Sequence, residues 1–443
     1  MCSLPRTAGV ARMTMDHSEP TRVRWLLVLW ISGMGAVSYL DRVNISIAGR
    51  SIERDFHLTN PELGAVFSAF AIGYALFQIP GGWMADRFGP RRILALGALW
   101  WTAFTAFTGS VPAGIGEALL VLWLVRFSLG VGESVMYPSS NRWLAAWIPR
   151  AERGAANGVI FAGVGAGAAF APPLVAAVMA RYGWRVSFQV CALAGVVSSV
   201  AWYWLARDAP RNHPWVSASE RKFIEAGIAD KGQSETSRLP WSVLFSSRDV
   251  WSITFSYFCY GYAAYIFFTW FFIYLTTVRG LNLKSGAFYT MLPFIAMSSC
   301  SALGGLLSDH VSKRWGRYAG RCGVAAGGLG GCTLFLAFGS IAHSAVTASL
   351  ILAGGAGALY IAQSSYWALA ADLGGASAGS LSGLINMGAQ FGSAITATLT
   401  PVIAAHLGWT VSFLIAAALC ALGAVAWLMV NPNRTLTANA RVG

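Results

Sequence analysis

The sequence predicts an all-α integral membrane protein with about twelve transmembrane helices in two six-helix bundles. Its 443 residues are 56% hydrophobic and only 11% charged, which is far too apolar for the surface of a soluble protein of this size. Runs of roughly 20 apolar residues, the length that crosses a bilayer as a helix, recur along the chain. The short alternating segments typical of a membrane β-barrel are absent from the sequence.

The apolar stretches set the order of the expected helices. They are 24–47, 61–84, 91–110, 117–144, 154–178, 184–206, 248–277, 286–308, 320–341, 345–371, 378–400 and 409–430. Glycine, with 49 residues, interrupts some of these stretches but suits the close helix packing found in lipid.

The longest polar interval divides the stretches six and six, so it is interpreted as a linker between two bundles. Within it, 217–229 allows a short surface helix. The predicted parts are an N-terminal tail (1–23), a first bundle (24–206), a cytoplasmic linker (207–247), a second bundle (248–430) and a C-terminal tail (431–443).

The two halves also resemble each other. Gly183–Phe188 reads GWRVSF and aligns with Gly408–Phe413, which reads GWTVSF, and Gly82–Asp86 aligns with Gly305–Asp309 at nearly the same offset along the chain. Because each half has an even number of stretches, the repeats have the same topology. Such repeats are typical of transporters whose halves are related by an axis along the membrane normal.

The net charge of +13 raises the question of nucleic-acid binding, which the placement of the basic residues answers. With a cytoplasmic N-terminus, most of them fall on the cytoplasmic side, as the positive-inside rule expects. Those residues are Arg22, Arg24, Arg87, Arg91, Arg92, Arg142, Arg150, Arg153, Lys313, Arg314, Arg317 and Arg321, with the basic residues of 207–248. We therefore expect no nucleic-acid partner and two cytoplasmic termini. The first 20 or so residues lack an apolar core, so no removable signal peptide is expected.

Two pairs of opposite charges fall inside the apolar stretches. Asp41 and Arg42 lie in the first, and Arg126 and Glu133 lie in the fourth. Charged groups at membrane depth are costly and mark ion, proton or substrate paths. Arg126 and Glu133 are two helical turns apart, so both should face the same side of their helix.

A string of residues follows the second apolar stretch. Gly82–Arg92 reads G-x-x-x-D-R-x-G-x-R-R, and Gly305–Asp309 is a weaker copy with His310 in place of the arginine. This string strongly resembles the signature loop of the major facilitator superfamily, and the resemblance covers nearly the whole chain. It implies that the loop acts as a conformational latch between the bundles, with Asp86, Arg87 and Asp309 as gating residues.

Two further motifs resemble the anion:cation symporter branch of that superfamily. Tyr39–Asn44 is similar to the first-helix motif Y-x-D-R-x-N, and Arg126–Glu133, continuing to Ser139, is similar to the fourth helix of the branch. Phe272 stands where the branch has a proline. The resemblance implies transport of organic anions, notably sugar acids such as hexonates, hexarates and hexuronates, usually with protons.

Arg42 is the predicted ligand of the substrate's carboxylate. Arginine stays protonated and offers a planar fork of donors that matches a carboxylate. Tyr39 and Asn44, on the same helix, can bond to substrate hydroxyls. The alternative is that Arg42 only pairs with Asp41 or Glu133 as part of the packing.

Four other residues are weaker substrate candidates. The branch resemblance favours Tyr74, Ser365 and Asn386, and Tyr265 is chosen from the aromatic seventh stretch. Each could equally serve as an interhelical hydrogen-bonding or packing residue.

Glu133 is the predicted principal proton carrier, with Asp41 as a second carboxylate coupled to Arg126. Burial favours a neutral acid and a neighbouring arginine favours the carboxylate, so the protonation state of either acid can be switched. In the alternative interpretation, Asp41 stays ionised and is only structural.

Other function classes fit less well. The six histidines include no H-E-x-x-H spacing and no P-loop string is present, so we expect no enzyme, no metal, no cofactor and no ATP-driven pump. A facilitator or anion exchanger, a transporter-like sensor, and uptake of an aromatic or dicarboxylic acid remain open. The Ala- and Gly-rich composition, with more Arg than Lys, favours a multi-pass protein of a bacterial inner membrane, and the family resemblance implies a monomer.

Overall fold

The computed structural model describes residues 21–58, 60–112, 117–228, 239–271, 274–434 and 436. These residues form helices joined by short turns, and no strand occurs among them, so the all-α prediction is confirmed. The predictions for Phe272, for most of the N-terminal tail and for much of the linker lie outside the described residues.

Seven α-helices form the first half of the chain, up to the linker. They are α1 (Val23–Phe56), α2 (Asn60–Phe88), α3 (Pro90–Ser110), α4 (Ala118–Glu133), α5 (Met136–Trp147), α6 (Arg153–Tyr182) and α7 (Trp184–Leu205), with the 3-10 turn η1 (Arg150–Glu152) before α6.

One expected helix is broken into two. The fourth apolar stretch forms α4 and α5, which are separated at Ser134 and Val135. The ring of a proline clashes with the carbonyl four residues earlier, and for Pro138 that residue is Ser134. The break between α4 and α5 therefore lies at the residue whose carbonyl the Pro138 ring would clash with in a continuous helix.

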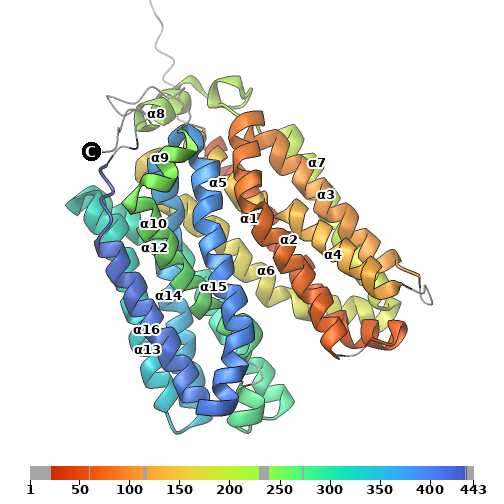
Figure 1. Cartoon of the computed structure of the whole chain (residues 1–443). Helices are drawn as coiled ribbons and strands as arrows, with labels where there is room; N and C mark the ends of the chain where they lie inside the picture. Colours follow the sequence, from red (N-terminus) through yellow and green to blue (C-terminus); the bar gives the residue numbers. More distant parts are fainter. Residues whose placement is uncertain are drawn as a thin grey trace, which may run out of the picture.

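The linker and the second half follow. They comprise η2 (Pro210–Asn212), α8 (Ala218–Ile228), α9 (Trp241–Ser246), α10 (Arg248–Thr269), the π-helical turn η3 (Tyr274–Val278), α12 (Leu283–Arg317), the π-helical turn η4 (Tyr318–Gly323), α13 (Val324–Ile341), α14 (Ala345–Gly374), η5 (Gly375–Ser377), α15 (Ala378–Leu407) and α16 (Trp409–Leu428). Figure 1 shows α1–α4 and α7 on one side, α10 and α12–α16 on the other, and α6 in the middle, with α8 at one end of the molecule.

A helix occurs at each of the twelve ranges expected from the sequence, and several helices run past the expected ends. Within the described ranges, nine stretches are long and apolar enough to cross a membrane. Three of these each join two α-helices, namely Ala118–Trp147, Phe288–Ile341 and Ala345–Ala397. The tyrosine-rich α10 is not among the nine.

The expected signature loop is mostly helical. Residues 82–88 belong to the last turns of α2, and 305–309 lie inside α12, which continues to Arg317. Only Gly89, with a φ of 92°, turns the chain into α3. A helix does not need an apolar environment to continue, so apolar length alone underestimated how far α2 and α12 extend.

The two halves pack against each other along two helix pairs, α2 with α15 and α6 with α12. Small residues permit this close approach. A Cβ added at Gly383 of α15 would lie 2.4 Å from the Gln78 carbonyl oxygen, and one at Gly158 of α6 would lie 2.6 Å from that of Ser301. Because α2 corresponds to α12 and α6 to α15 in the internal repeat, the same contact is made twice.

Candidate functional site

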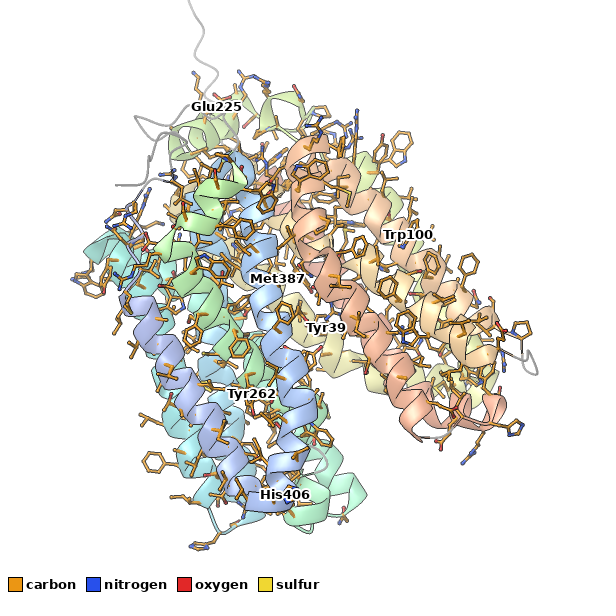
Figure 2. The ribbon with its side chains drawn as sticks, viewed as in Figure 1. Tyr39, Trp100, Glu225, Tyr262, Met387 and His406 are labelled. Carbon is orange, nitrogen blue, oxygen red and sulfur yellow. The ribbon has the colours of Figure 1, made fainter. Side chains whose placement is uncertain are left out.

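A small cavity of about 60 Å³ lies between the two halves, with room for only a few water molecules in this conformation. Tyr39 of α1 lies where the two groups of helices face each other (Figure 2). The cavity is lined by Tyr39, Arg42, Tyr74, Tyr137, Phe161, Val164, Tyr257, Tyr260, Gly261, Ala264, Tyr265, Phe268, Tyr360, Gln363, Trp367, Asn386, Ala389, Gln390 and Ser393.

Among the described lining residues, Arg42 is the one that carries a charge. Its guanidinium carbon lies 4.4 Å from the ring centre of Tyr74, 4.8 Å from that of Tyr39 and 5.0 Å from that of Phe70. Its Nε donates to Oε1 of Glu133 at 2.6 Å. Aromatic faces attract a guanidinium and limit its rotation, so the three rings and the carboxylate hold Arg42 at the cavity wall.

Glu133, the last residue of α4, is fully buried behind Arg42. The same oxygen, Oε1, also accepts a hydrogen bond of 2.6 Å from Ser38 Oγ. The other oxygen of Glu133 and the Nη2 of Arg42 are buried without a hydrogen bond. Glu133 therefore bonds to Nε of the Arg42 guanidinium and leaves Nη2 without a hydrogen bond.

Asp41 and Arg126 are also almost fully buried, but neither lines the cavity. Neither carboxylate oxygen of Asp41 has a hydrogen bond, and the neighbouring Thr105 hydroxyl donates to the Trp101 carbonyl at 3.0 Å. The Nε and Nη1 of Arg126 lack one as well. Among the described residues, Asp41 and Arg126 make no ion pair within 4.0 Å, so their coupling is electrostatic and not a direct contact.

The helical period explains which predicted residues of α1 reach the cavity. Tyr39 and Arg42 are three residues apart and share a face, whereas Asn44 follows Arg42 by two residues and lies on the opposite face. Asn44 accepts from Ser187 Oγ at 2.8 Å and donates to Cys191 Sγ at 3.4 Å. Asn44 therefore does not line this cavity, and its contact with the substrate stays a prediction.

The same argument applies to Ser365 on α14. Gln363 and Trp367 are four residues apart and face the cavity, where each donates to the hydroxyl of Tyr257 at 2.9 Å. Ser365 lies between them in sequence, so it faces away, and its hydroxyl is 3.4 Å from that of Ser308. Ser365 therefore does not line this cavity either, and its contact with the substrate also stays a prediction.

Three further predicted residues do line the cavity, from three different helices. They are Tyr74 of α2, Tyr265 of α10 and Asn386 of α15. Asn386 donates from Nδ2 to Oε1 of Gln78 at 2.9 Å, which links α15 to α2 across the cavity wall.

Several lining tyrosines were not among the predicted site residues, namely Tyr137, Tyr257, Tyr260 and Tyr360. A signal for two of them exists in the sequence. The lining residues of α10 recur at steps of three to four residues and form one stripe along the helix. They are Tyr257, Tyr260, Gly261, Ala264, Tyr265 and Phe268. If Tyr265 faces the cavity, the helical period predicts that the other residues of this stripe, including Tyr257 and Tyr260, face it too.

Asp86 joins the two halves at the end of the molecule that carries the linker. It accepts hydrogen bonds from the backbone nitrogens of Gly379 at 3.0 Å and Ser380 at 2.7 Å, and from Ser380 Oγ at 2.6 Å. These donors belong to the first turn of α15, where a helix has free N–H groups and favours negative charge. The Nε of Arg142 lies 3.5 Å from the same carboxylate.

Asp309 makes the matching contact in the second repeat. It accepts from the backbone nitrogens of Gly154 at 3.0 Å and Ala155 at 2.7 Å, in the first turn of α6. Arg321 pairs with Asp309 at 2.7 Å, and Arg153 pairs with Asp372 at the same distance. Arg87, also predicted to gate, lies over the Trp83 and Phe88 rings of its own helix.

The chain resembles known proteins along most of its length. Residues 31–397 match the model of the Major Facilitator Superfamily. A probable sulfoacetate transporter of Cupriavidus necator is 37% identical over 409 residues, which cover 90% of this chain and 92% of the relative. A probable galactarate/D-glucarate transporter of Bacillus subtilis is 32% identical over 72% of each chain, and a probable L-galactonate transporter of Escherichia coli is 29% identical over 92% of this chain and 89% of the relative.

A solved structure shares the fold. The proton:xylose symporter XylE, bound to 6-bromo-6-deoxy-D-glucose, superposes with a TM-score of 0.72 at 15% identity, covering 90% of this chain and 94% of XylE. The family model, the identity with the Cupriavidus relative and this shared fold lead to one conclusion. The chain belongs to the Major Facilitator Superfamily and is a membrane transporter, not an enzyme.

Proposed function

We propose that this protein is a proton-coupled symporter that takes up an organic carboxylate anion, a sugar acid, by alternating access. The carrying observation is the position of Arg42, with one side of its guanidinium facing the cavity and its Nε bonded to the buried Glu133. In this proposal a monomer crosses a bacterial inner membrane twelve times, in bundles 24–206 and 248–430, with both termini in the cytoplasm.

The lining supports a hydroxylated acid as substrate. One arginine can bind one carboxylate, and the remaining polar lining consists of tyrosine hydroxyls with the side chains of Gln363, Asn386, Gln390 and Ser393. Hydroxyl and amide groups donate and accept, as a sugar acid's hydroxyls require. Two relatives bear names of sugar-acid transporters, for galactarate or D-glucarate and for L-galactonate.

The Arg42–Glu133 pair supplies the coupling step. When a proton binds the Glu133 carboxylate, the ion pair loses its negative partner and the Nε of Arg42 becomes free to join Nη2 in a two-point bond to a substrate carboxylate. Loss of substrate and proton on the other side restores the pair. A ligand shifts a conformational equilibrium only through different affinities for the two states, and this exchange of partners provides that difference.

Asp41 and Arg126 form a second, deeper charge pair in this scheme. Because both lie buried beside Glu133 without formed hydrogen bonds at several atoms, a change of charge on Glu133 alters their energy strongly. We assign Asp41 as the second carboxylate that responds to the proton on Glu133.

Alternating access requires the contacts at the linker end to break and reform. Asp86 and Asp309 each accept backbone N–H groups from the opposite half, at the starts of α15 and α6. While these bonds are made, α2 stays against α15 and α12 against α6. Release of substrate into the cytoplasm therefore needs both sets of bonds to open.

Uptake into proteoliposomes tests the proposal. Labelled sugar acids are offered with an inward proton gradient, with and without an uncoupler, to wild type, Glu133→Gln and the exposed control Glu225→Gln. We expect one acid to accumulate in wild type and in the control, and accumulation to be lost with uncoupler or in Glu133→Gln while exchange persists. Uptake that is unchanged by the uncoupler and by Glu133→Gln would contradict the proton coupling and would indicate a facilitator or an anion exchanger.

A second candidate substrate is a small sulfonated carboxylate, because the relative with 37% identity is named as a probable sulfoacetate transporter. Its sulfonate can use the same arginine fork. Sulfoacetate, an aromatic acid and a dicarboxylate therefore belong in the same uptake panel. Binding of an acid without any flux would instead indicate a sensor.

A further inference from the structure

A second cavity lies on the outer face of the first half, between α3 and α7. Its volume is about 320 Å³, and it shares no lining residue with the cavity between the halves. It is lined by Arg92, Ala95, Leu96, Leu99, Ser199, Val200, Tyr203 and Trp204.

The lining residues form a groove that runs along the two helices. Arg92, Leu96 and Leu99 stand on successive turns of α3, so they follow one face from its N-terminal end. At the floor, Ser199 Oγ donates to the Ala95 carbonyl at 2.8 Å and holds α7 to α3. Leu96 is 62% exposed and Trp204 73% exposed, so the walls face the surroundings of the protein, which for this outer face are lipid.

One end of the groove is basic. Arg92 is exposed and makes no ion pair within the described ranges. Arg91 donates twice to the Tyr203 carbonyl, at 2.9 and 2.6 Å, and Arg207 donates to backbone carbonyls near the end of α7. The carboxylate at this end, Asp208, accepts from the Arg91 backbone nitrogen at 2.9 Å. Three guanidinium groups thus stand near one carboxylate that already has a donor.

We propose that this groove binds an anionic phospholipid. The headgroup phosphate would lie against Arg92, and an acyl chain would lie along Leu96, Leu99 and Val200. Basic residues beside a groove between membrane helices attract anionic headgroups, and Tyr203 and Trp204 are of the type that prefers the headgroup level. The excess of positive charge disfavours a headgroup that carries its own ammonium. The site depends only on the outer surface of the protein and stands whether or not the proposed substrate and coupling hold.

Native mass spectrometry of the delipidated protein tests the site. Phosphatidylglycerol and phosphatidylcholine with identical acyl chains are titrated against wild type, Arg92→Gln and Val200→Trp. Arg314→Gln serves as the matched control, because Arg314 is exposed on the corresponding segment of the second half and its guanidinium lies over Trp315.

We expect wild type to bind phosphatidylglycerol more tightly than phosphatidylcholine. Arg92→Gln should weaken phosphatidylglycerol about fivefold, which corresponds to about 1 kcal/mol for one basic residue at a membrane surface, and should leave phosphatidylcholine unchanged. Val200→Trp should weaken both lipids by filling the groove, and Arg314→Gln should weaken neither. Equal binding of the two lipids to wild type, or equal losses in Arg92→Gln and Arg314→Gln, would overturn the proposal, because binding would then be non-specific lipid contact only.

Discussion

Replacing Gly82 by alanine tests how closely α2 and α15 must approach at the linker end. A Cβ at this position would lie 2.1 Å from the Gly379 carbonyl oxygen, 2.6 Å from its carbonyl carbon and 3.1 Å from the Ser380 nitrogen. All three are backbone atoms at the start of a helix, so none can rotate away. The two helices must separate to accommodate the methyl group.

The size of the effect follows from these distances. Ordinary contact begins at 3.4 Å, so the backbones must move apart by about 1.3 Å, the difference from the 2.1 Å approach. The same movement would lengthen the 2.7 Å bond from the Ser380 nitrogen to Asp86 to about 4 Å, beyond hydrogen-bond range. Overpacking costs about 1–3 kcal/mol, and a lost bond to a charged group costs about 1.5–3 kcal/mol. When the helices separate, the overpacking is relieved but the hydrogen bond to Asp86 is lost, so only one of the two costs applies at a time. We therefore expect Gly82→Ala to destabilise the closed contact by about 2 kcal/mol, which is a roughly 30-fold shift toward separated halves at this end.

Electron–electron double resonance measures this shift directly. Lys222 lies on α8, which packs against α5 and pairs with α1 of the first half through Glu220 and Arg24, and Lys313 lies on α12 of the second half. Both side chains are exposed, so spin labels at these two positions report on opposite halves. Gly82→Ala should increase the population of longer distances. Gly305→Ala should act in the same direction, because its Cβ would lie 2.1 Å from the Gly154 carbonyl oxygen.

A matched control is available in α1. A Cβ at Gly33 meets no atom within 4 Å, so Gly33→Ala adds the same methyl group to a helix without a clash. If Gly82→Ala gives the same distance distribution as Gly33→Ala, the close approach at residue 82 does not hold the two halves together, and the reasoning is refuted.

Two further predictions separate site residues from structural ones. Asn386→Ala should raise the KM for uptake several-fold, because Asn386 lines the cavity, and should also lower the Tm, because the buried Oε1 of Gln78 loses its donor. Asn44→Ala should lower the Tm by removing the buried hydrogen bonds of Asn44 with Ser187 and Cys191, although Ser187 Oγ keeps the Trp184 carbonyl as an acceptor, and should leave the KM unchanged. Uptake kinetics and thermal unfolding check both variants, and a KM raised by Asn44→Ala but not by Asn386→Ala would contradict our placement of the cavity. Hydrogen bonds from Trp184 and Arg185 hold the pKa of Asp55 below its ordinary value of 3.8, so this carboxylate stabilises the fold above that pH and the contribution is lost as the pH falls through the lower folded value. Asp55→Asn should therefore be less stable than wild type at neutral pH and converge with it in acid, and a constant difference in Tm across the pH range would contradict this role.

The helices were predictable because the signal that produces them is local. A run of about 20 apolar residues predicts a helix regardless of its neighbours, and the structure has a helix at each of the expected ranges. The expected ends of α2 and α12 were too short, since apolarity stops at the lipid boundary while a helix can continue into polar surroundings. The break between α4 and α5 was also predictable, because Pro138 in the fourth apolar stretch can kink its helix.

The cavity was only partly predictable. Five residues that the sequence predicts to bind substrate line it, namely Tyr39, Arg42, Tyr74, Tyr265 and Asn386. Sequence patterns identify polar residues inside apolar helices, but they do not say which face of each helix points inward. Asn44 and Ser365, each two residues away from a lining neighbour, lie on helix faces that are turned away from the cavity.

The chain's composition and patterns are sufficient to predict a helical membrane protein with an internal repeat, because apolar length, net charge and repeated motifs can be measured along one dimension. The partners of its charged groups cannot be obtained in that way. Arg42 meets Glu133 from a position 91 residues away, and Asp86 meets the start of α15 from 293 residues away. Those pairs depend on which helices become neighbours and on the rotation of each about its axis, and only the packing of the whole bundle sets both.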